Sequence, residues 1–134
     1  MSEAFTKSGT SIPFVGLGTW DMQGSICSSI VQEALEMGYR HIDGASMYEN
    51  ESEVGKGLSD SGVDREEIFI TTKINTTSWT LSKGNGPPLQ NKDIVKHFEK
   101  SLKDLQTDYV DLLLIHWPKF ETNLGDMLDI LYKL

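Results

Sequence analysis

Short apolar segments alternate with amphipathic segments along this chain, and this alternation restricts the fold more than any other feature. The segments that we expect to be strands are residues 14–20, 40–45, 68–74 and 109–117. The segments with apolar residues at helical spacing are residues 25–37, 50–58 and 91–105, with a further one that begins at residue 124. Strands that alternate with helices form a parallel sheet with right-handed crossovers, so the sequence predicts an α/β fold. A β-hairpin is expected at residues 4–14, before the first strand.

The composition is that of an ordinary globular protein. With 134 residues, of which 38% are hydrophobic and 24% charged, residues 1–134 are expected to form one domain with its own core. The net charge of -8 argues against binding to nucleic acid, which requires clustered Lys and Arg. No apolar run is long enough to cross a membrane, no signal-peptide pattern begins the chain, and Cys27 is the single cysteine. We therefore expect a cytoplasmic protein whose partners include neither a membrane nor nucleic acid.

Polar or aromatic side chains occur at the end of every expected parallel strand. They are Trp20, Asp43, Lys73, His116 and Trp117, in chain order. Parallel strands bring their C-terminal ends to one edge of the sheet, which is where α/β folds bind ligands and carry out chemistry. Tyr48 follows Asp43 in the polar turn after the second strand. The sequence therefore predicts a site at this edge.

Four of these side chains have the chemistry of a proton-transfer site. A buried lysine needs a counter-charge, and Asp43 on the neighbouring strand is the expected partner of Lys73. A free phenol holds its proton tightly near neutral pH, but a nearby ammonium favours the phenolate. Tyr48 beside Lys73 is therefore the candidate general acid. His116 is the candidate hydrogen-bond donor that orients a carbonyl oxygen or helps to move a proton.

Aromatic residues are expected to surround this group. The candidate lining of the substrate pocket is Trp20, Tyr48, Trp79, His116 and Trp117. A metal site is not expected, because the three histidines of the chain fall on different elements without the spacing of metal ligands.

Each of these residues also has a purely structural interpretation. Taken alone, Asp43 caps the following helix, Tyr48 packs the loop, and Lys73 is a surface lysine. His116 within its apolar strand is more often a core histidine, and a single tryptophan usually belongs to the core or its rim. The coincidence of all of them at one sheet edge favours the catalytic interpretation.

One long motif carries a family resemblance. Residues 38–51 read Gly-Tyr-Arg-His-Ile-Asp-Gly-Ala-Ser-Met-Tyr-Glu-Asn-Glu, and residues 14–20, 68–73 and 108–118 support them. Over about residues 5–134, the chain resembles the aldo-keto reductase family. The resemblance implies a (β/α)8 TIM barrel that reduces aldehydes and ketones with NADPH and without a metal.

The resemblance also assigns roles to individual residues. The catalytic Asp, Tyr, Lys and His of the family match Asp43, Tyr48, Lys73 and His116. The resemblance implies that the tyrosine protonates the carbonyl oxygen, that the nicotinamide supplies the hydride, and that the histidine orients a small carbonyl substrate. Among the family's cofactor-contact positions, Thr19, Trp20 and Asp43 have matches here.

The number of strand–helix units differs from the family pattern. A (β/α)8 barrel has eight units, and this chain supplies four after its hairpin. We therefore expect residues 1–134 to be a partial, truncated domain that forms the N-terminal half of a barrel. The leading hypothesis is an NADP-dependent oxidoreductase, which self-associates or assembles with a complementing half through its open sheet edge. The alternatives are a non-catalytic half-barrel interaction protein, which pairs with a partner through the same edge, and an inactive remnant.

Overall fold

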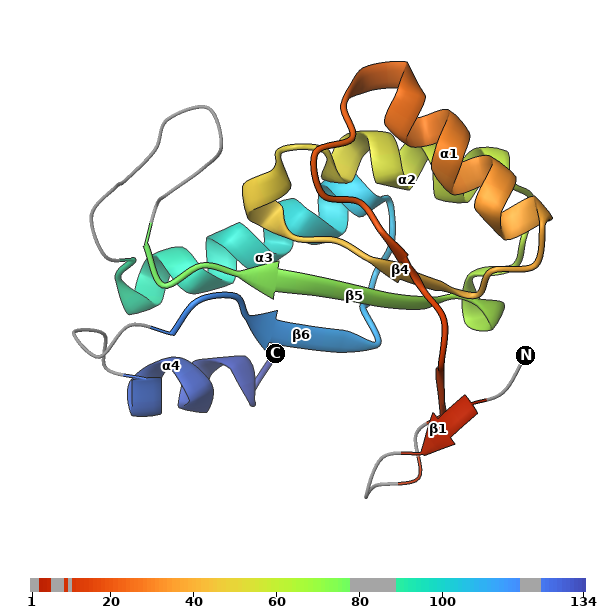
Figure 1. Cartoon of the computed structure of the whole chain (residues 1–134). Helices are drawn as coiled ribbons and strands as arrows, with labels where there is room; N and C mark the ends of the chain where they lie inside the picture. Colours follow the sequence, from red (N-terminus) through yellow and green to blue (C-terminus); the bar gives the residue numbers. More distant parts are fainter. Residues whose placement is uncertain (1–2, 6–8, 10, 78–88, 119–123) are drawn as a thin grey trace.

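The main sheet consists of parallel strands, as the alternation predicts. The computed structural model describes residues 3–5, 9, 11–77, 89–118 and 124–134 (Figure 1). The strands of the main sheet are β3 (Leu17–Gly18), β4 (His41–Asp43), β5 (Phe69–Ile74) and β6 (Leu112–Ile115). They lie side by side in the order in which they occur along the chain, and every neighbouring pair is parallel. The predicted α/β fold is therefore confirmed.

Helices connect these strands. Within the described residues they are α1 (Gly24–Glu36), α2 (Glu51–Asp60), α3 (Asn91–Leu105) and α4 (Leu124–Leu131), with the short 3-10 helices η1 (Ser46–Tyr48) and η2 (Arg65–Glu67). Helices α1, α2 and α3 lie together on one side of the sheet, and α4 lies beside β6 (Figure 1). The predicted hairpin is confirmed, because β1 (Glu3–Phe5) pairs antiparallel with β2 (Ser11–Pro13) in a separate small sheet.

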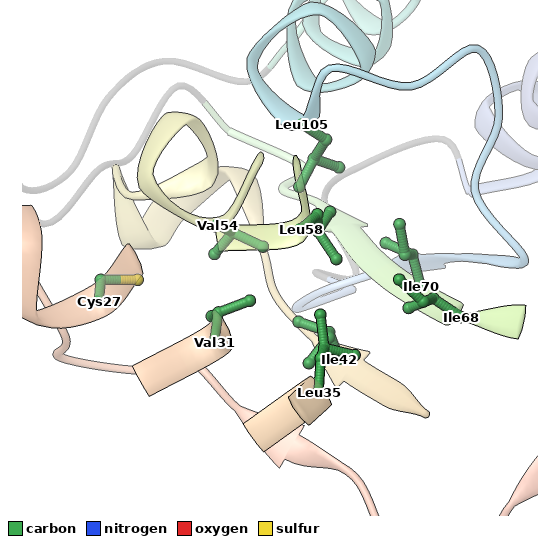
Figure 2. Packing of buried hydrophobic residues seen from close by; sticks show 9 residues of the cluster. All are labelled: Cys27, Val31, Leu35, Ile42, Val54, Leu58, Ile68, Ile70 and Leu105. Atoms are coloured by element: carbon green, nitrogen blue, oxygen red, sulfur yellow. The ribbon is translucent and has the colours of Figure 1, made fainter. Parts of the chain in front are cut away.

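The largest hydrophobic cluster joins α1 and α2 to the sheet. Its members are Cys27, Val31, Leu35, Ile42, Val54, Leu58, Ile68, Ile70 and Leu105 (Figure 2). A second cluster, of Ile74, Ile94, Phe98 and Met127, fills the space between α3, α4 and β5. Full burial of one aliphatic or aromatic side chain of this kind contributes about 1.5–3 kcal/mol. The two clusters hold the helices on the sheet and so fix the positions of the strand ends.

Helix α2 packs against both of its neighbours through glycines. A Cβ atom on Gly57 would lie 2.6 Å from the carbonyl oxygen of Ser28 in α1. A Cβ atom on Gly55 would collide with the carbonyl oxygen of Asp104 in α3. The backbone of α2 therefore approaches both helices more closely than any larger residue would allow.

The strands at both sides of the sheet are shorter than the apolar patterns predict. Of residues 14–20, only Leu17 and Gly18 are in register with residues of β4, and the backbone N–H of Thr19 adds one hydrogen bond to the Asp43 carbonyl. The ladder of the last strand begins at Leu112 and not at residue 109. Just before Leu112, the Ile70 N–H of β5 donates to a side chain and not to a backbone carbonyl. The acceptor is the Oδ2 atom of Asp111, at 2.8 Å.

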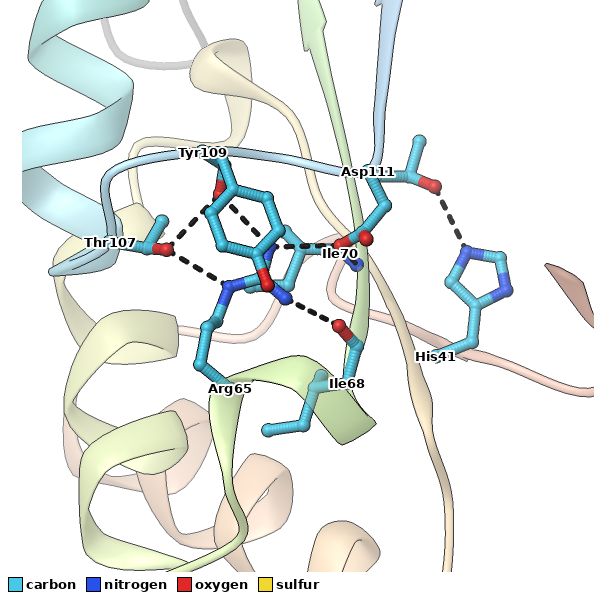
Figure 3. Close-up of polar contacts among 8 residues, drawn as sticks. His41, Arg65, Ile68, Ile70, Thr107, Tyr109 and Asp111 are labelled. Atoms are coloured by element: carbon cyan, nitrogen blue, oxygen red, sulfur yellow. Dashed lines mark hydrogen bonds and ion pairs between the residues drawn. The ribbon is translucent and has the colours of Figure 1, made fainter. Parts of the chain in front are cut away.

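A polar cluster surrounds Asp111 at the N-terminal ends of β5 and β6 (Figure 3). Arg65 donates to the hydroxyl of Thr107 at 2.9 Å, to the carbonyl of Tyr109 at 2.9 Å and to Oδ2 of Asp111 at 2.8 Å. Its guanidinium group also stacks on the Tyr109 ring, 3.9 Å from the ring centroid. We call these four residues the Arg65 cluster; they fix the start of β6 against the start of β5.

Candidate active site

An ion pair between neighbouring strands forms the base of the candidate site. Asp43 is the last residue of β4, and Lys73 is the last residue but one of β5. The Lys73 Nζ atom lies 2.7 Å from Asp43 Oδ1 and donates a second hydrogen bond, of 2.9 Å, to the carbonyl oxygen of Gly44. The Lys73 side chain is 13% exposed and that of Asp43 is 40% exposed. The expected pairing of Lys73 with Asp43 is therefore present, with the ammonium largely shielded from solvent.

Helix η1 holds the candidate acid beside this ammonium. The backbone N–H of Tyr48 donates to the Ala45 carbonyl, and the Ser46 hydroxyl donates to the Lys73 carbonyl at 3.0 Å. The Tyr48 side chain is buried, and its Oη atom lies 3.5 Å from Lys73 Nζ. Lys73 Nζ also lies 5.3 Å from the centroid of the Tyr48 ring. The phenol oxygen is thus at the outer limit of hydrogen-bond distance from the ammonium.

His116, the first residue after β6, completes the group. Its backbone N–H donates to the Ile74 carbonyl at 2.8 Å, which extends the pairing of β6 with β5 by one residue. The His116 ring packs edge-to-face on the Tyr48 ring, with centroids 5.5 Å apart. Burial lowers the pKa of His116 and the Lys73 ammonium lowers it further, whereas Asp43 opposes the shift. Burial and the Lys73 ammonium therefore both favour the neutral form of the imidazole.

One nitrogen of this imidazole has no hydrogen-bond partner among the described residues. It is the Nδ1 atom of His116, which is buried. A neutral imidazole has one N–H donor and one bare nitrogen. A proton on Nε2, which is not among the buried unpaired atoms, avoids burying an N–H group on Nδ1 without an acceptor. This arrangement favours the tautomer that is protonated on Nε2.

Two tryptophans extend the aromatic surroundings. The Trp20 ring packs edge-to-face on Tyr48 at 4.9 Å, and the Trp117 ring packs on His116 at 6.0 Å. Both tryptophans are more than half exposed, so both have a surface available to a ligand. Four of the five expected pocket residues therefore form one chain of ring contacts. The fifth, Trp79, lies outside the described residues.

The three expected cofactor-contact residues lie at the ends of β3 and β4. Thr19 is fully buried, and its backbone N–H donates to the Asp43 carbonyl at 3.0 Å. Trp20 is exposed, and the carboxylate of Asp43 remains partly exposed despite its ion pair. A Cβ atom added to Gly18 would meet nothing within 4 Å, so the backbone beside Trp20 has open space.

Two neighbouring residues of the site were missed or misread at the sequence level. The spacing of Asn50 and Glu53 predicts a capping box for α2, and this prediction is wrong, because the Asn50 side chain makes no cap hydrogen bond. The side-chain amide of Asn50 instead donates to the carbonyls of Thr19 and Met22, at 2.7 and 2.8 Å. Glu51 is buried as well, and only its place in the polar turn of the motif signalled a role.

The model of the Aldo/keto reductase family matches residues 15–134. The chain belongs to this family. Methylglyoxal reductase DkgB of Yersinia pestis is 45% identical over 108 residues, which cover 81% of this chain and 37% of that protein. An aldehyde reductase of Saccharomyces cerevisiae is 48% identical over 112 residues, which cover 84% of this chain and 32% of that protein.

Solved structures agree with this membership. An aldo/keto reductase from Brucella melitensis superimposes with a TM-score of 0.85 at 38% identity, over 99% of this chain and 47% of that chain. An aldo-keto reductase of Bombyx mori, solved in complex with NADP, gives a TM-score of 0.75 at 31% identity over 96% of this chain and 46% of that chain. The chain therefore has the fold of these reductases and spans less than half the length of the relatives it matches.

The described part of the chain carries no candidate for a membrane span or a metal site. None of the helices in these ranges combines the length and the apolar composition needed to cross a membrane. No group of three or more His, Cys, Asp or Glu side chains in the same ranges is arranged to hold a metal ion.

Proposed function

We propose that this chain carries the proton-donating site of an NADPH-dependent reductase that converts aldehydes and ketones to alcohols. The observation that carries the proposal is the position of Lys73 Nζ, which is 2.7 Å from Asp43 Oδ1 and 3.5 Å from Tyr48 Oη. A largely shielded ammonium beside a buried phenol is suited to stabilise the negative charge that develops as the phenol gives up its proton.

In this mechanism Tyr48 is the general acid. Its Oη atom gives a proton to the carbonyl oxygen of the substrate, and the resulting phenolate is stabilised by the Lys73 ammonium. Asp43 and the Gly44 carbonyl hold that ammonium in place. Thr19, Trp20 and Asp43 would hold a reduced nicotinamide, which would supply the hydride for the carbonyl carbon. After Tyr48 has given its proton to the carbonyl oxygen, it regains a proton from solvent.

His116 is proposed to orient the carbonyl oxygen. Its lowered pKa favours the neutral ring, and the tautomer that is protonated on Nε2 would present an N–H donor to the substrate. The ring contact between His116 and Tyr48, with centroids 5.5 Å apart, supports this role. A carbonyl oxygen held by both Nε2–H and Oη–H would be polarised toward hydride addition. Trp20 and Trp117 would then exclude water from this pocket.

The cofactor-contact residues fit a nicotinamide group. The open space beside Gly18, the exposed Trp20 ring and the partly exposed Asp43 carboxylate lie along one edge of the sheet. A flat ring and a polar amide can be accommodated by such a surface. Thr19 is proposed to act indirectly, since it is fully buried and supports the Asp43 backbone.

The test is reduction of methylglyoxal by NADPH, with Tyr48→Phe as the diagnostic variant and Tyr39→Phe as the matched control. We expect Tyr48→Phe to lower kcat by about 10²–10⁴-fold, because it removes only the proton donor, and Tyr39→Phe to leave kcat unchanged. Quenching of tryptophan fluorescence by NADPH should be the same in all three proteins. A chain that shows no fluorescence response at millimolar NADPH, or a Tyr48→Phe variant with the parental rate, contradicts the proposal.

A second candidate function is association through the edge of the sheet. A groove between β6 and α4 is lined by Leu114, Leu128 and Tyr132, and all three side chains are exposed. Apolar surface of this kind favours a second copy of the chain or a complementing half of the barrel. The molar mass in solution tests this candidate, and a soluble monomer over the whole micromolar range would rule out self-association.

A further inference from the structure

The acidic side chain of Glu51 is buried next to the candidate site, but it takes no part in the proposed proton transfer. Glu51 is the first residue of α2 and is 6% exposed. Its Oε1 atom accepts a hydrogen bond of 2.6 Å from the Thr72 hydroxyl of β5. Its Oε2 atom accepts one of 2.8 Å from the Ser101 hydroxyl of α3. The carboxyl group therefore joins the start of α2 to a strand on one side and to a helix on the other.

The strand contact is made next to the lysine of the site. Thr72 precedes Lys73 in β5, and successive residues of a strand point to opposite faces of the sheet. Lys73 extends toward Asp43 and Tyr48, while Thr72 extends to the face that the helices cover. A change in the distance between Glu51 and Thr72 therefore changes the position of the Lys73 backbone relative to residues 48–51.

The other side of this segment is fixed by its neighbour. Asn50 is fully buried and donates to the carbonyls of Thr19 and Met22, in the loop that carries Trp20. In the same loop, the side chain of Gln23 donates to the Tyr48 carbonyl at 3.0 Å. The segment that carries Tyr48 is therefore tied to the β3 side by Asn50 and to the β5 side by Glu51.

A carboxyl group is an unfavourable choice for a purely structural contact at this position. Burial raises the pKa of Glu51, and Asp104 adds to the shift, while the hydrogen bonds from Thr72 and Ser101 and the charge of Lys100 oppose it. The fold therefore holds an acid where its charged form is disfavoured. A carboxylate nevertheless suits this position, because its two oxygens can accept from the hydroxyl groups of Thr72 and Ser101, which lie on different elements.

We propose that Glu51 is a positioning residue for Tyr48, which sets the distance between the Tyr48 hydroxyl and Lys73 by tying the start of α2 to Thr72 of β5. This inference rests on the proposed function of Tyr48 and Lys73. The 3.5 Å between Oη and Nζ leaves little room for a further increase before the contact is lost. Ser101 holds the other oxygen of Glu51 but belongs to α3, which contributes no residue to the candidate site.

Two variants separate the positioning role from a structural one. Thr72→Val removes the hydroxyl on the strand side and keeps the shape of the side chain, and Ser101→Ala removes the hydroxyl on the helix side. Each variant takes one hydrogen bond from the same carboxylate, so the two should lose similar stability. Only Thr72→Val should alter the contact between Tyr48 and Lys73.

The contact is measured by carbon-13 NMR of the full chain with labelled tyrosine, the Tyr48 signal being assigned with Tyr48→Phe. The chemical shift of this Tyr48 signal is compared between a protein that has Lys73 and the same protein with Lys73→Met. The difference reports how strongly the ammonium acts on the phenol. We expect Thr72→Val to reduce this difference to about half or less and Ser101→Ala to leave it unchanged. Circular dichroism checks that each variant remains folded at the temperature of measurement.

The possible outcomes are distinct. A Lys73-dependent difference that is unchanged in Thr72→Val, or equally reduced in Ser101→Ala, overturns the positioning role of Glu51 and leaves the proposed function intact. A Tyr48 signal that does not respond to Lys73→Met in the parent chain overturns the contact between ammonium and phenol, and the proposed function and this inference fail together.

Discussion

The two ends of the parallel sheet each contain an ion pair, and the pairs differ in what else they contact. At the C-terminal ends of the strands, Lys73 Nζ lies 2.7 Å from Asp43 Oδ1. At the N-terminal ends, Arg65 Nη2 lies 2.8 Å from Asp111 Oδ2. The distances are nearly equal, so the distance alone does not distinguish a catalytic pair from a structural one.

The surroundings do distinguish them. In the Arg65 cluster, the guanidinium donates to two backbone carbonyls, a hydroxyl and a carboxylate, and Asp111 also accepts the Ile70 N–H (Figure 3). At the other end, the Lys73 ammonium faces the Tyr48 phenol at 3.5 Å, and His116 Nδ1 has no partner among the described residues. A cluster in which every donor has an acceptor stabilises the fold. A cluster that leaves polar atoms without a protein partner is suited to bind a substrate.

The largest effect that this comparison predicts is on catalysis. Lys73→Met should lower kcat for the reduction of methylglyoxal by about 10²-fold or more, because the phenolate of Tyr48 would lose the charge that stabilises it. The free energy of unfolding should change by only about 1 kcal/mol, since the partner carboxylate of Asp43 is 40% exposed and can be hydrated. Steady-state kinetics and urea denaturation measure the two quantities. A Lys73→Met variant with a large loss of stability and the kcat of the parent would show that this ion pair is structural and not catalytic.

The same replacement at the other end should have the opposite effect. Arg65→Met should lower the free energy of unfolding by about 2 kcal/mol or more, because it removes the hydrogen bonds that Arg65 donates to the carboxylate of Asp111 and to the carbonyls of Tyr109 and Ile68. Asp111 then keeps only the Ile70 N–H, and the Tyr109 carbonyl keeps only the Thr107 hydroxyl. The value of kcat should remain that of the parent. Lys56→Met is the matched control, since it breaks the exposed ion pair with Asp60 and should cost at most about 0.5 kcal/mol. Equal losses in Arg65→Met and Lys56→Met would show that the Arg65 cluster does not stabilise the sheet.

The sequence was informative about the C-terminal end of the sheet and silent about the N-terminal end. Asp43, Lys73 and His116 were predicted to meet because parallel strands must bring their C-terminal ends to one edge. Their geometry is as expected, and their catalytic roles stay predictions. The pairing of Arg65 with Asp111 was not predicted in this way, because Arg65 lies before the strand expected at residues 68–74, whereas Asp111 lies inside the strand expected at residues 109–117.

Local patterns were less reliable where a distant group competes for the same side chain. The spacing of Asn50 and Glu53 is that of a capping box, but the carbonyls of Thr19 and Met22 take the amide of Asn50. The expected strand at residues 109–117 was too long for a similar reason, since the side chain of Asp111 replaces a backbone acceptor at the start of β6. In both places a tertiary hydrogen bond, which no local window contains, decides the local structure.

Glu51 should make the stability of the chain depend on pH, because it is an acid buried next to the candidate site at the C-terminal end of the sheet. Its pKa in the folded chain is raised above the ordinary value of 4.5, so the folded state holds this proton more tightly than the unfolded state does. The contribution of Glu51 to stability is therefore fully present below pH 4.5 and is lost as the pH rises through the raised pKa. Glu51→Gln should remove this decrease, which urea denaturation over a pH series would measure. The same pH dependence of stability in the parent and in Glu51→Gln would show that Glu51 is not the group responsible.

His116 should cause the smallest change, of the opposite sign. Its pKa in the folded chain is lowered from the ordinary value of 6.5, so the unfolded state binds the proton more tightly. The contribution of the neutral ring to stability is then present above pH 6.5 and is lost as the pH falls below that value, through the lowered pKa. His116→Asn should flatten this part of the stability curve, and Arg65→Met should not, because an arginine stays protonated throughout. If Arg65→Met flattens the curve as well, the pH response does not belong to the site end of the sheet.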